Sequence, residues 1–226
     1  MGGQACILYG AAEFSRDADL AILADETNLA NLGKALAELQ ASVIAVPPFD
    51  VQFLKRGHAI HFRSAHPDAQ GVRIDIMSVM RGVDAFTDLW TRRTTFTFDG
   101  DTVDVMSLPD LVTAKKTQRD KDWPMIRRLV DVNFFENSGN ATAERIAFWL
   151  RELRSPEILS RLVLEYPAQA EMAAARRNVV RLAAAGASEI DLNRALYEEE
   201  QQERSADKAY WEPLRHEIEA LRRRSR

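Results

Sequence analysis

Two glycines and three aspartates are the residues of this chain whose types and spacing best suit chemistry. Gly2 and Gly3 are followed, after thirteen intervening residues, by Asp17 and Asp19, and Asp75 lies in a later apolar run. Side chains at positions i and i+2 of a strand point to the same face, so Asp17 and Asp19 are expected side by side. Because like charges this close repel each other, a folding core gains nothing from them.

A divalent cation removes this repulsion. Mg²⁺ takes carboxylate oxygens as ligands and keeps open positions for phosphate. Three carboxylates can hold two such ions about 3.5–4 Å apart, an arrangement that clamps the attacking and leaving oxygens in phosphoryl and nucleotidyl transfer. The residues therefore predict a metal-dependent nucleotidyltransferase that uses Mg²⁺ or Mn²⁺, with Asp17, Asp19 and Asp75 as metal ligands and catalytic residues.

The composition is that of an ordinary globular protein. The 226 residues carry a net charge of −4, so the chain as a whole shows no electrostatic sign of nucleic-acid binding. Its single cysteine, Cys6, excludes an intrachain disulfide and favours a cytoplasmic location. No apolar run approaches the roughly 20 residues that cross a bilayer, so no membrane association is expected.

The first part of the chain alternates expected strands and helices. A helix is predicted from Gln4 to Tyr9 after a Gly-Gly turn, and a second over Thr27–Leu39 with Asp25 or Thr27 as its cap. A helix that starts at Leu108-Pro109-Asp110 is expected to contain Lys115 and Lys116. The expected strands are Ser15–Leu23, Ser42–Val46, Ala59–Arg63, Val72–Met77, Thr94–Phe98 and Thr102–Met106, the last two forming a hairpin across Asp99-Gly100-Asp101.

From about Asp120 onward only helices are expected. Their predicted ranges are Trp123–Phe135, Ala141–Arg154, Glu157–Leu164, Glu171–Ala185 and Glu189–Arg222, with an interruption near Pro213. The predicted fold class is therefore α+β: a small mixed-sheet nucleotidyltransferase domain over residues 1–120, followed by an α-helical C-terminal domain over residues 121–226.

The order of these motifs resembles the nucleotidyltransferase (polymerase β-like) superfamily, and within it the group of AbiEii-type toxins and hypothetical nucleotidyltransferases. The resemblance covers about residues 2–130. An Asp-x-Asp motif alone is common, whereas a Gly-Gly pair at this distance before it is more specific. The motifs that carry the resemblance are Gly2-Gly3-Gln4-Ala5, Tyr9-Gly10, the run from Ser15 to Leu20, Arg73-Ile74-Asp75-Ile76, Leu108-Pro109-Asp110-Leu111, Lys115-Lys116 and Arg119-Asp120-Lys121-Asp122.

The resemblance implies a role for each of the first five residues. Gly2 and Gly3 would let the backbone approach the triphosphate of an NTP closely, because they carry no Cβ. Asp17 and Asp19 would bind two ions, while Asp75 would hold the catalytic ion and orient or deprotonate the acceptor hydroxyl. Attack on the α-phosphate would release pyrophosphate, with positioning and electrostatics supplying most of the catalysis.

The resemblance also implies nucleotide-binding residues outside these five. It places Ser15 and Arg16 beside the nucleotide, although Arg16 could equally anchor a neighbouring carboxylate. Lys115 or Lys116 would neutralise charge on the β- and γ-phosphates. Adjacent helical residues point about 100° apart, so at most one of the two lysines is expected to face the site.

Structural roles are the alternatives for the same residues. Asp17 and Asp19 could be surface carboxylates at a strand edge. Asp75 could pair with Arg73 or Arg16 in a structural salt bridge. The two histidines near the third strand, His58 and His61, are expected to be half-buried sheet residues and not ligands.

Three functions fit the residues. The first is an enzyme that moves NMP from an NTP to an RNA, protein or small-molecule acceptor, in a toxin–antitoxin or phage-defence setting with a cognate antitoxin as partner. The second is a catalytically silent module that binds nucleotide or a partner. The three retained carboxylates favour the enzyme, and the short segment before Gly2 favours the silent module. The third is a drug-modifying enzyme of the aminoglycoside type, which would need an acidic cleft.

Overall fold

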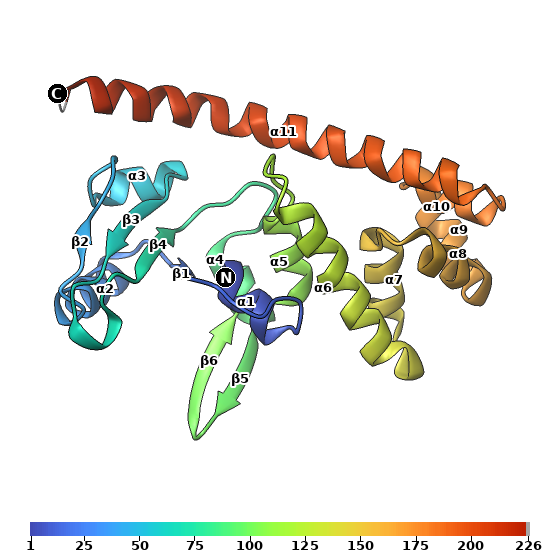
Figure 1. The fold of residues 1–226 in the computed structure, drawn as a ribbon, viewed down its shortest axis with the longest axis horizontal. Helices are drawn as coiled ribbons and strands as arrows, with labels where there is room; N and C mark the ends of the chain where they lie inside the picture. The colour runs from blue at the N-terminus through green and yellow to red at the C-terminus, as the bar shows by residue number, and fades with distance from the viewer. Residues whose placement is uncertain (225–226) are drawn as a thin grey trace. The chain divides into compact units, whose positions relative to one another are not determined.

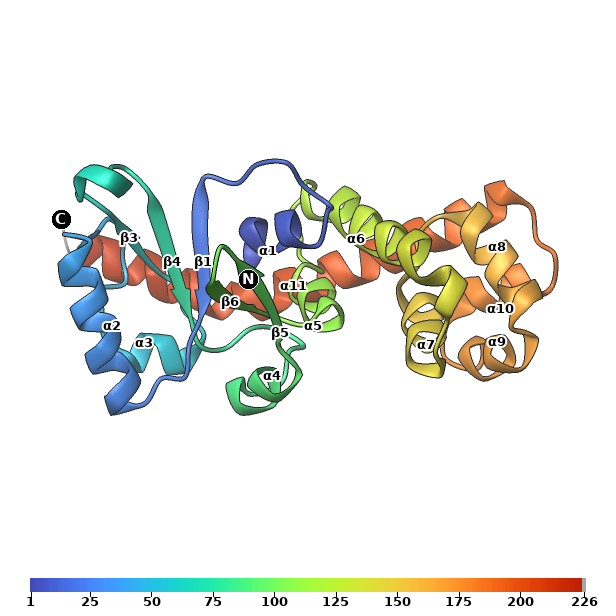
Figure 2. The ribbon, with the colours of Figure 1, turned by 90° about the horizontal axis from the view of Figure 1, so that it is seen from below.

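The computed structural model describes residues 1–224, which form two compact units (Figures 1 and 2). Unit 1 consists of Met1–Ala114 and the end of the last helix from Lys208, and unit 2 consists of Lys115–Asp207. Both sheets lie in unit 1, while unit 2 is helical, so the expected α+β class with a helical C-terminal region is confirmed. The expected domain boundary at residue 120 stays a prediction. The last two residues of the predicted helical domain, 225 and 226, lie outside the described part of the chain.

A four-stranded mixed sheet forms the centre of unit 1. Its strands are β1 (Asp17–Ala21), β2 (Ser42–Val43), β3 (Ile60–Arg63) and β4 (Arg73–Met77), in the spatial order β1-β4-β3-β2. β1 and β4 run parallel, whereas β3 is antiparallel to both of its neighbours. All four strands were predicted, although β2 is only two residues long. A short 3-10 turn, η1 (Pro67–Ala69), lies between β3 and β4.

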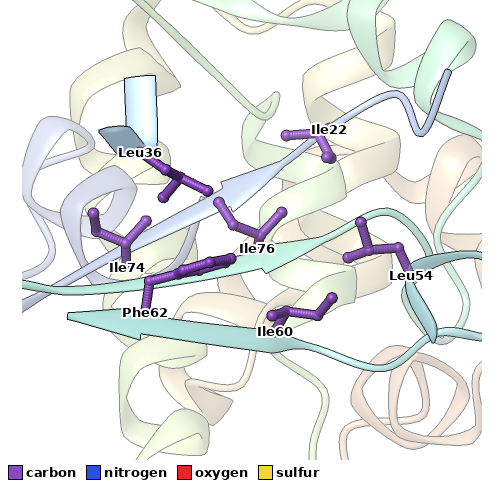
Figure 3. Close-up of a cluster of buried hydrophobic side chains, with 7 residues drawn as sticks. All are labelled: Ile22, Leu36, Leu54, Ile60, Phe62, Ile74 and Ile76. Carbon is purple, nitrogen blue, oxygen red and sulfur yellow. The ribbon is translucent and has the colours of Figure 1, made fainter. Parts of the chain in front are cut away.

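Alternation along the strands gives this sheet one apolar and one polar face. The apolar face packs against α2 (Glu26–Glu38) and α3 (Val51–Arg56) and forms the core of unit 1 (Figure 3). The buried residues of this core are Ile22, Leu36, Leu54, Ile60, Phe62, Ile74 and Ile76. Asp25 caps α2 as expected, because its side chain accepts a hydrogen bond from the Asn28 amide.

The first helix, α1 (Gly2–Leu8), lies against β1 (Figure 2). A helix was expected to begin at Gln4 after a Gly-Gly turn, but both glycines belong to its first turn. The reason is steric, since residues without a Cβ at these two positions let the start of α1 approach β1 closely.

The second sheet of unit 1 is the predicted hairpin, with β5 (Thr94–Phe98) paired to β6 (Asp101–Val105). Asp99 and Gly100 both have positive φ, as a two-residue hairpin turn requires. α4 (Phe86–Arg92) precedes the hairpin and was not predicted, and neither was α3.

The helix after the hairpin, α5 (Leu108–Ala114), is shorter than expected. The prediction that it contains Lys115 and Lys116 is wrong. The chain turns at Lys115, whose carbonyl accepts a hydrogen bond from the Thr117 amide, and the Lys115 side chain is buried beside Asp122. A buried ion pair thus fixes this residue in the loop rather than in the helix.

Unit 2 is built from helices. They are α6 (Asp122–Asn137), α7 (Ala143–Glu152), α8 (Pro156–Glu165), α9 (Pro167–Ala174), α10 (Asn178–Ala184) and the first part of α11 (Glu189–Arg224), with a short 3-10 turn, η2 (Ser138–Asn140). The single helix expected over Glu171–Ala185 is wrong, because the chain breaks between α9 and α10. Arg177 holds this break in place by donating hydrogen bonds to the carbonyls of Leu150 and Leu153.

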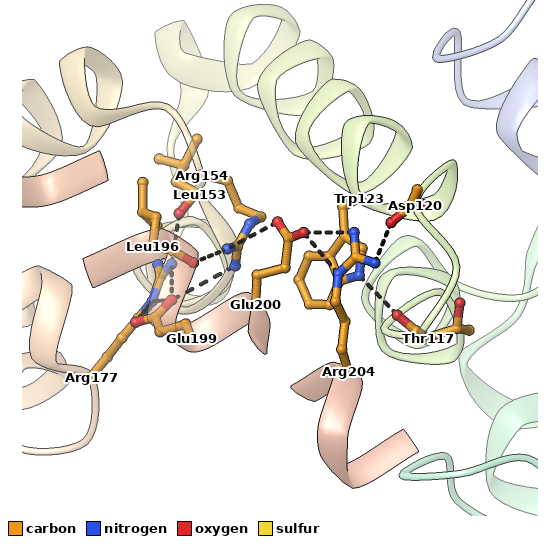
Figure 4. Close-up of polar contacts among 10 residues, drawn as sticks. All are labelled: Thr117, Asp120, Trp123, Leu153, Arg154, Arg177, Leu196, Glu199, Glu200 and Arg204. Atoms are coloured by element: carbon orange, nitrogen blue, oxygen red, sulfur yellow. Dashed lines mark hydrogen bonds and ion pairs between the residues drawn. The ribbon is translucent and has the colours of Figure 1, made fainter. Parts of the chain in front are cut away.

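α11 is continuous over 36 residues, and the interruption expected near Pro213 does not occur. Within unit 2, arginines hold its first part to the other helices (Figure 4). Arg177 forms an ion pair with Glu199, and Arg204 donates to the Gln118 carbonyl while its guanidinium lies over Trp123. No helix within residues 1–224 is both long and apolar enough to cross a membrane.

Candidate functional site

The three predicted carboxylates lie on the polar face of the four-stranded sheet. Asp19 on β1 is the register partner of Asp75 on β4, and Asp17 is the partner of Arg73. Neighbouring strands lie about 4.8 Å apart, and side chains at paired positions leave the same face. The fold therefore brings Asp17, Asp19 and Asp75 to one face, with Arg73 among them. The strand pattern predicted this for Asp17 and Asp19.

Asp75 is held by two neighbours, His61 and Arg73. Its Oδ1 lies 2.8 Å from Nδ1 of His61 and accepts a hydrogen bond of 2.8 Å from Nε of Arg73. Burial alone would raise the pKa of Asp75, but the hydrogen bonds from His61 and Arg73 and the charges of both outweigh it, so the pKa lies below its usual range. The structural alternative for Asp75, a salt bridge with Arg73, is therefore present.

His61 cannot satisfy both of its neighbours at once. Its Nδ1 lies 2.8 Å from Oδ1 of Asp75 and 3.0 Å from an Nη of Arg73. Arginine only donates hydrogen bonds, and an ionised aspartate only accepts them. A protonated Nδ1 therefore suits Asp75, and an unprotonated one suits Arg73. A ligand that bound Oδ1 of Asp75 would therefore favour the His61 tautomer whose Nδ1 accepts a hydrogen bond from Arg73.

Asp19 and Ser15 fill the space that side chains at the two glycines would need. A Cβ on Gly2, whose φ is +68°, would lie 1.8 Å from Oδ2 of Asp19, and one on Gly3 would lie 2.4 Å from Oγ of Ser15. The Gly3 amide makes a long hydrogen bond of 3.4 Å to Oδ2 of Asp19. The glycine pair and the first carboxylate motif are thus in contact.

Asp17 and Arg16 have fewer contacts. In the described part of the chain, the Asp17 carboxylate accepts no hydrogen bond, although its charge raises the pKa of Arg73 together with the stronger effect of Asp75. Arg16 lies over the ring of Phe14, at 5.8 Å from its centre, and forms no ion pair with a described carboxylate. Its expected role as an anchor for a neighbouring carboxylate is therefore not seen.

Lys115 and Lys116 belong to unit 2 and are ion-paired there. The Nζ of Lys115 lies 3.5 Å from Oδ1 of Asp122, and the Nζ of Lys116 lies 2.7 Å from Oε2 of Glu152. Both side chains are largely buried, as are their two partners. Phosphate binding by either lysine stays a prediction, and it would require its ion pair to open.

The donor chemistry of the site fits a hard divalent ion, but its geometry is not that of a preformed metal centre. No three His, Cys, Asp or Glu side chains within residues 1–224 converge as a metal-binding group. The reason is visible at Asp75, whose Oδ1 is directed to His61 and Arg73. Its Oδ2 accepts no hydrogen bond from any described residue, and neither does the Asp17 carboxylate, so oxygens for an ion remain.

Two residues of this face, His61 and Arg73, were not predicted as parts of the site. His61 was correctly expected to be a half-buried sheet residue, but its bond to Asp75 was missed. The same expectation for His58 is wrong, because His58 is fully buried and precedes β3. Alternation of Ile60, His61 and Phe62 places His61 on the polar side of its strand, which was the available signal. The register between β3 and β4, which sets His61 opposite Asp75, could not be derived from that pattern.

No protein-family model matches this chain, and comparison with curated proteins and with solved structures finds no match either.

Proposed function

We propose that unit 1 is the catalytic part of a metal-dependent nucleotidyltransferase, which moves NMP from an NTP to an acceptor hydroxyl or phosphate. The observation that supports this best is the register of Asp19 with Asp75 on parallel β1 and β4, with Asp17 on the same face. Three carboxylates gathered in this way stabilise nothing by themselves, since like charges at this separation repel. The close approach of Gly2 to Asp19 also supports the proposal, because it brings the Gly-Gly motif next to the first carboxylate motif.

The residues present fit Mg²⁺ or Mn²⁺, because all three are hard oxygen donors and each keeps at least one oxygen that accepts no hydrogen bond from a described residue. A bound ion would neutralise charge on the triphosphate and on the pyrophosphate that leaves. Asp17, Asp19 and Asp75 would hold it. Ser15 supports this arrangement by donating a hydrogen bond to the Asp17 carbonyl, which fixes the start of β1.

The chain's own residues can orient the acceptor. With Oδ1 of Asp75 held by His61 and Arg73, Oδ2 is left to accept a hydrogen bond from the acceptor hydroxyl. The hydroxyl oxygen bonds to the α-phosphorus as the bond to pyrophosphate breaks, and the hydroxyl proton passes through Oδ2 of Asp75 to water. Because the low pKa of Asp75 makes it a weak base, its main contribution is orientation.

A catalytically silent, nucleotide- or partner-binding module is the second candidate. The contacts of Asp75 favour it, because Arg73 already neutralises the carboxylate that would have to bind an ion, and His61 contacts the same carboxylate oxygen. The toxin–antitoxin setting and an antitoxin partner rest on the resemblance alone. So does the choice of acceptor between RNA, protein and a small molecule.

A transfer assay separates the two candidates. Each NTP, radiolabelled at the α-phosphate, is incubated with Mg²⁺, total cell RNA and protein, and the full chain. The Asp19→Asn variant is run beside Asp68→Asn, which changes the charge equally at a fully exposed position on η1. We expect label on an acceptor with the wild type and with Asp68→Asn, and none with Asp19→Asn. Nucleotide binding without transfer in all three proteins would favour the silent module.

A further inference from the structure

The β5–β6 hairpin carries an apolar face that the rest of unit 1 covers only at its base. Register places Phe96 opposite Val103 and Thr94 opposite Val105, so these side chains share a face with Phe98. The exposed fraction rises along this face from 6% at Val105 to 43% at Val103 and 48% at Phe98. In Figure 1 the hairpin extends beyond the other elements of its unit. Its outer half is therefore an exposed apolar surface.

The base of the hairpin is anchored, so this surface is a fixed platform. The Tyr9 hydroxyl hydrogen-bonds with Oγ1 of Thr94 and donates to the Met106 carbonyl, each at 2.8 Å. The Tyr9 ring meets Phe96 edge-on, and Phe96 stacks in parallel on Phe98. Burial of Tyr9 raises the pKa of its hydroxyl, so these hydrogen bonds persist through the neutral range.

Neither edge of this hairpin is paired with another described strand. In the described chain, β5 and β6 pair only with each other, so each strand has an outer row of backbone groups without a strand partner. Isolated two-stranded sheets are marginally stable in water, and an extended peptide that adds a strand satisfies these groups. Side chains at alternate positions of such a peptide would lie on the exposed apolar face.

The charge of the hairpin selects the partner. The segment from Thr94 to Val105 contains three aspartates and no lysine or arginine. Asp104 forms an ion pair with Arg93, but Asp99 and Asp101, at the turn, form none within residues 1–224. This negative end repels phosphate groups and attracts lysine and arginine. A nucleic acid is disfavoured on the same ground, even though aromatic rings are exposed.

We propose that the β5–β6 hairpin is a docking surface for a basic polypeptide segment that binds in extended form. Its alternate apolar side chains would pack on Phe98 and Val103, and its basic side chains would lie near Asp99 and Asp101. This inference is independent of the nucleotidyl-transfer proposal, because it uses no residue of the carboxylate face.

The test measures binding of a fluorescent peptide of alternating lysine and valine to the full chain by anisotropy. We expect Phe98→Ser to weaken binding about tenfold, because it removes a large apolar contact. Asp99→Asn with Asp101→Asn should weaken it about threefold and reduce its salt dependence. Asparagine tolerates the positive φ of residue 99, so the turn is kept.

Two variants outside the hairpin are the matched controls. Phe135→Ser, at an exposed position of α6, and Asp68→Asn should leave binding unchanged.

Four outcomes would overturn the proposal. One is equal affinity of the hairpin variants and the wild type, with circular dichroism showing that all are folded. Another is equal binding of a glutamate–valine peptide, which would remove the charge argument. Single-stranded RNA that binds in place of the peptide and is lost in Phe98→Ser would identify a base-stacking surface. Self-association of the wild type in sedimentation, lost in Phe98→Ser, would identify a second copy of the chain as the occupant. Should Phe98→Ser misfold, Val103→Thr, which suits a strand, replaces it.

Discussion

Asp19 and Asp75 occupy paired positions on two adjacent parallel strands, so their carboxylates leave the sheet side by side on its polar face. Each is balanced by different groups. Arg73 and His61 contact Asp75, whereas among the described residues the Asp19 carboxylate accepts only the long hydrogen bond from the Gly3 amide. The repulsion of this pair is therefore relieved at one carboxylate and remains at the other. Of these two carboxylates, Asp19 is therefore the one whose charge should matter more for cation binding.

From this imbalance we expect Mg²⁺ to stabilise the wild-type chain and not the Asp19→Asn variant. A ligand that binds only the folded state at about 100 times its Kd raises the free energy of unfolding by about 2.7 kcal/mol. Without Mg²⁺, the variant should be at least as stable as the wild type, because one repulsive charge is gone. Thermal unfolding with EDTA and with excess Mg²⁺ measures both effects.

The control for this comparison is Asp68→Asn, which removes an equal charge from an exposed position. It should respond to Mg²⁺ as the wild type does. A stabilisation of Asp19→Asn equal to that of the wild type would show that the ion binds elsewhere on the chain.

We expect Gly2→Ala to destabilise unit 1. The added Cβ would lie 1.8 Å from Oδ2 of Asp19, and φ at this position is +68°, so α1 must move away from β1. A clash of this kind costs about 1–3 kcal/mol. Gly33→Ala is the matched control, because nothing lies within 4 Å of its added Cβ in the middle of α2. It should stabilise by about 0.5–1 kcal/mol. Urea unfolding followed by circular dichroism gives both values, and equal effects of the two substitutions would rule out the close approach of α1 to β1.

The strands of both sheets could be predicted because side-chain alternation and turn residues are local signals. Ile60, Phe62, Ile74 and Ile76 mark their own buried face, and Asp99-Gly100 marks the hairpin turn. α3 and α4 could not be predicted, because a helix of six or seven residues has too few turns to show a period. Asp50 caps the start of α3 and Gly57 ends it, while the buried Leu54 packs α3 onto the sheet, a contact that depends on the sheet beneath it.

The candidate site could likewise be predicted only where it depends on local spacing. The i, i+2 spacing places Asp17 and Asp19 on one face, and the flanking isoleucines place Asp75 on the polar face of its own strand. The neighbours of Asp75 were not predictable, because they depend on the strand order β1-β4-β3 and on its register. Lys115 was misplaced for a similar reason, since its buried partner Asp122 is the first residue of α6, and periodicity within the preceding helix does not reveal this contact.

Asp75 should make the stability of unit 1 sensitive to acid. Its pKa is lower in the folded state than in the unfolded chain, so its contribution is fully present above the unfolded value and is lost as the pH falls through the folded one. Arg73→Met should raise the pKa of Asp75, because the effect of burial is then less opposed. Carbon-detected NMR titration of the carboxyl measures the shift. An unchanged pKa in Arg73→Met would show that the ion pair is not formed in solution.

The end of α11 should depend on one buried histidine in unit 1. His58 is 1% exposed, and its Nε2 lies 2.6 Å from Oε2 of Glu217, which also pairs with Arg56. The other ring nitrogen, Nδ1, is buried and has no partner. Glu217→Ala would therefore leave both ring nitrogens of a buried side chain unsatisfied, at a cost of about 1–3 kcal/mol.

We expect this loss to appear as faster amide hydrogen exchange in α11 from Lys208 onward and as a lower unfolding temperature of unit 1. Glu219→Ala is the control, because it removes the same side chain from an exposed position of the same helix. Glu217→Gln should retain much of the stability, since its amide oxygen can still accept from Nε2 of His58. If exchange in this segment were equal for Glu217→Ala and Glu219→Ala, the contact with His58 would contribute nothing to holding the end of α11 in unit 1.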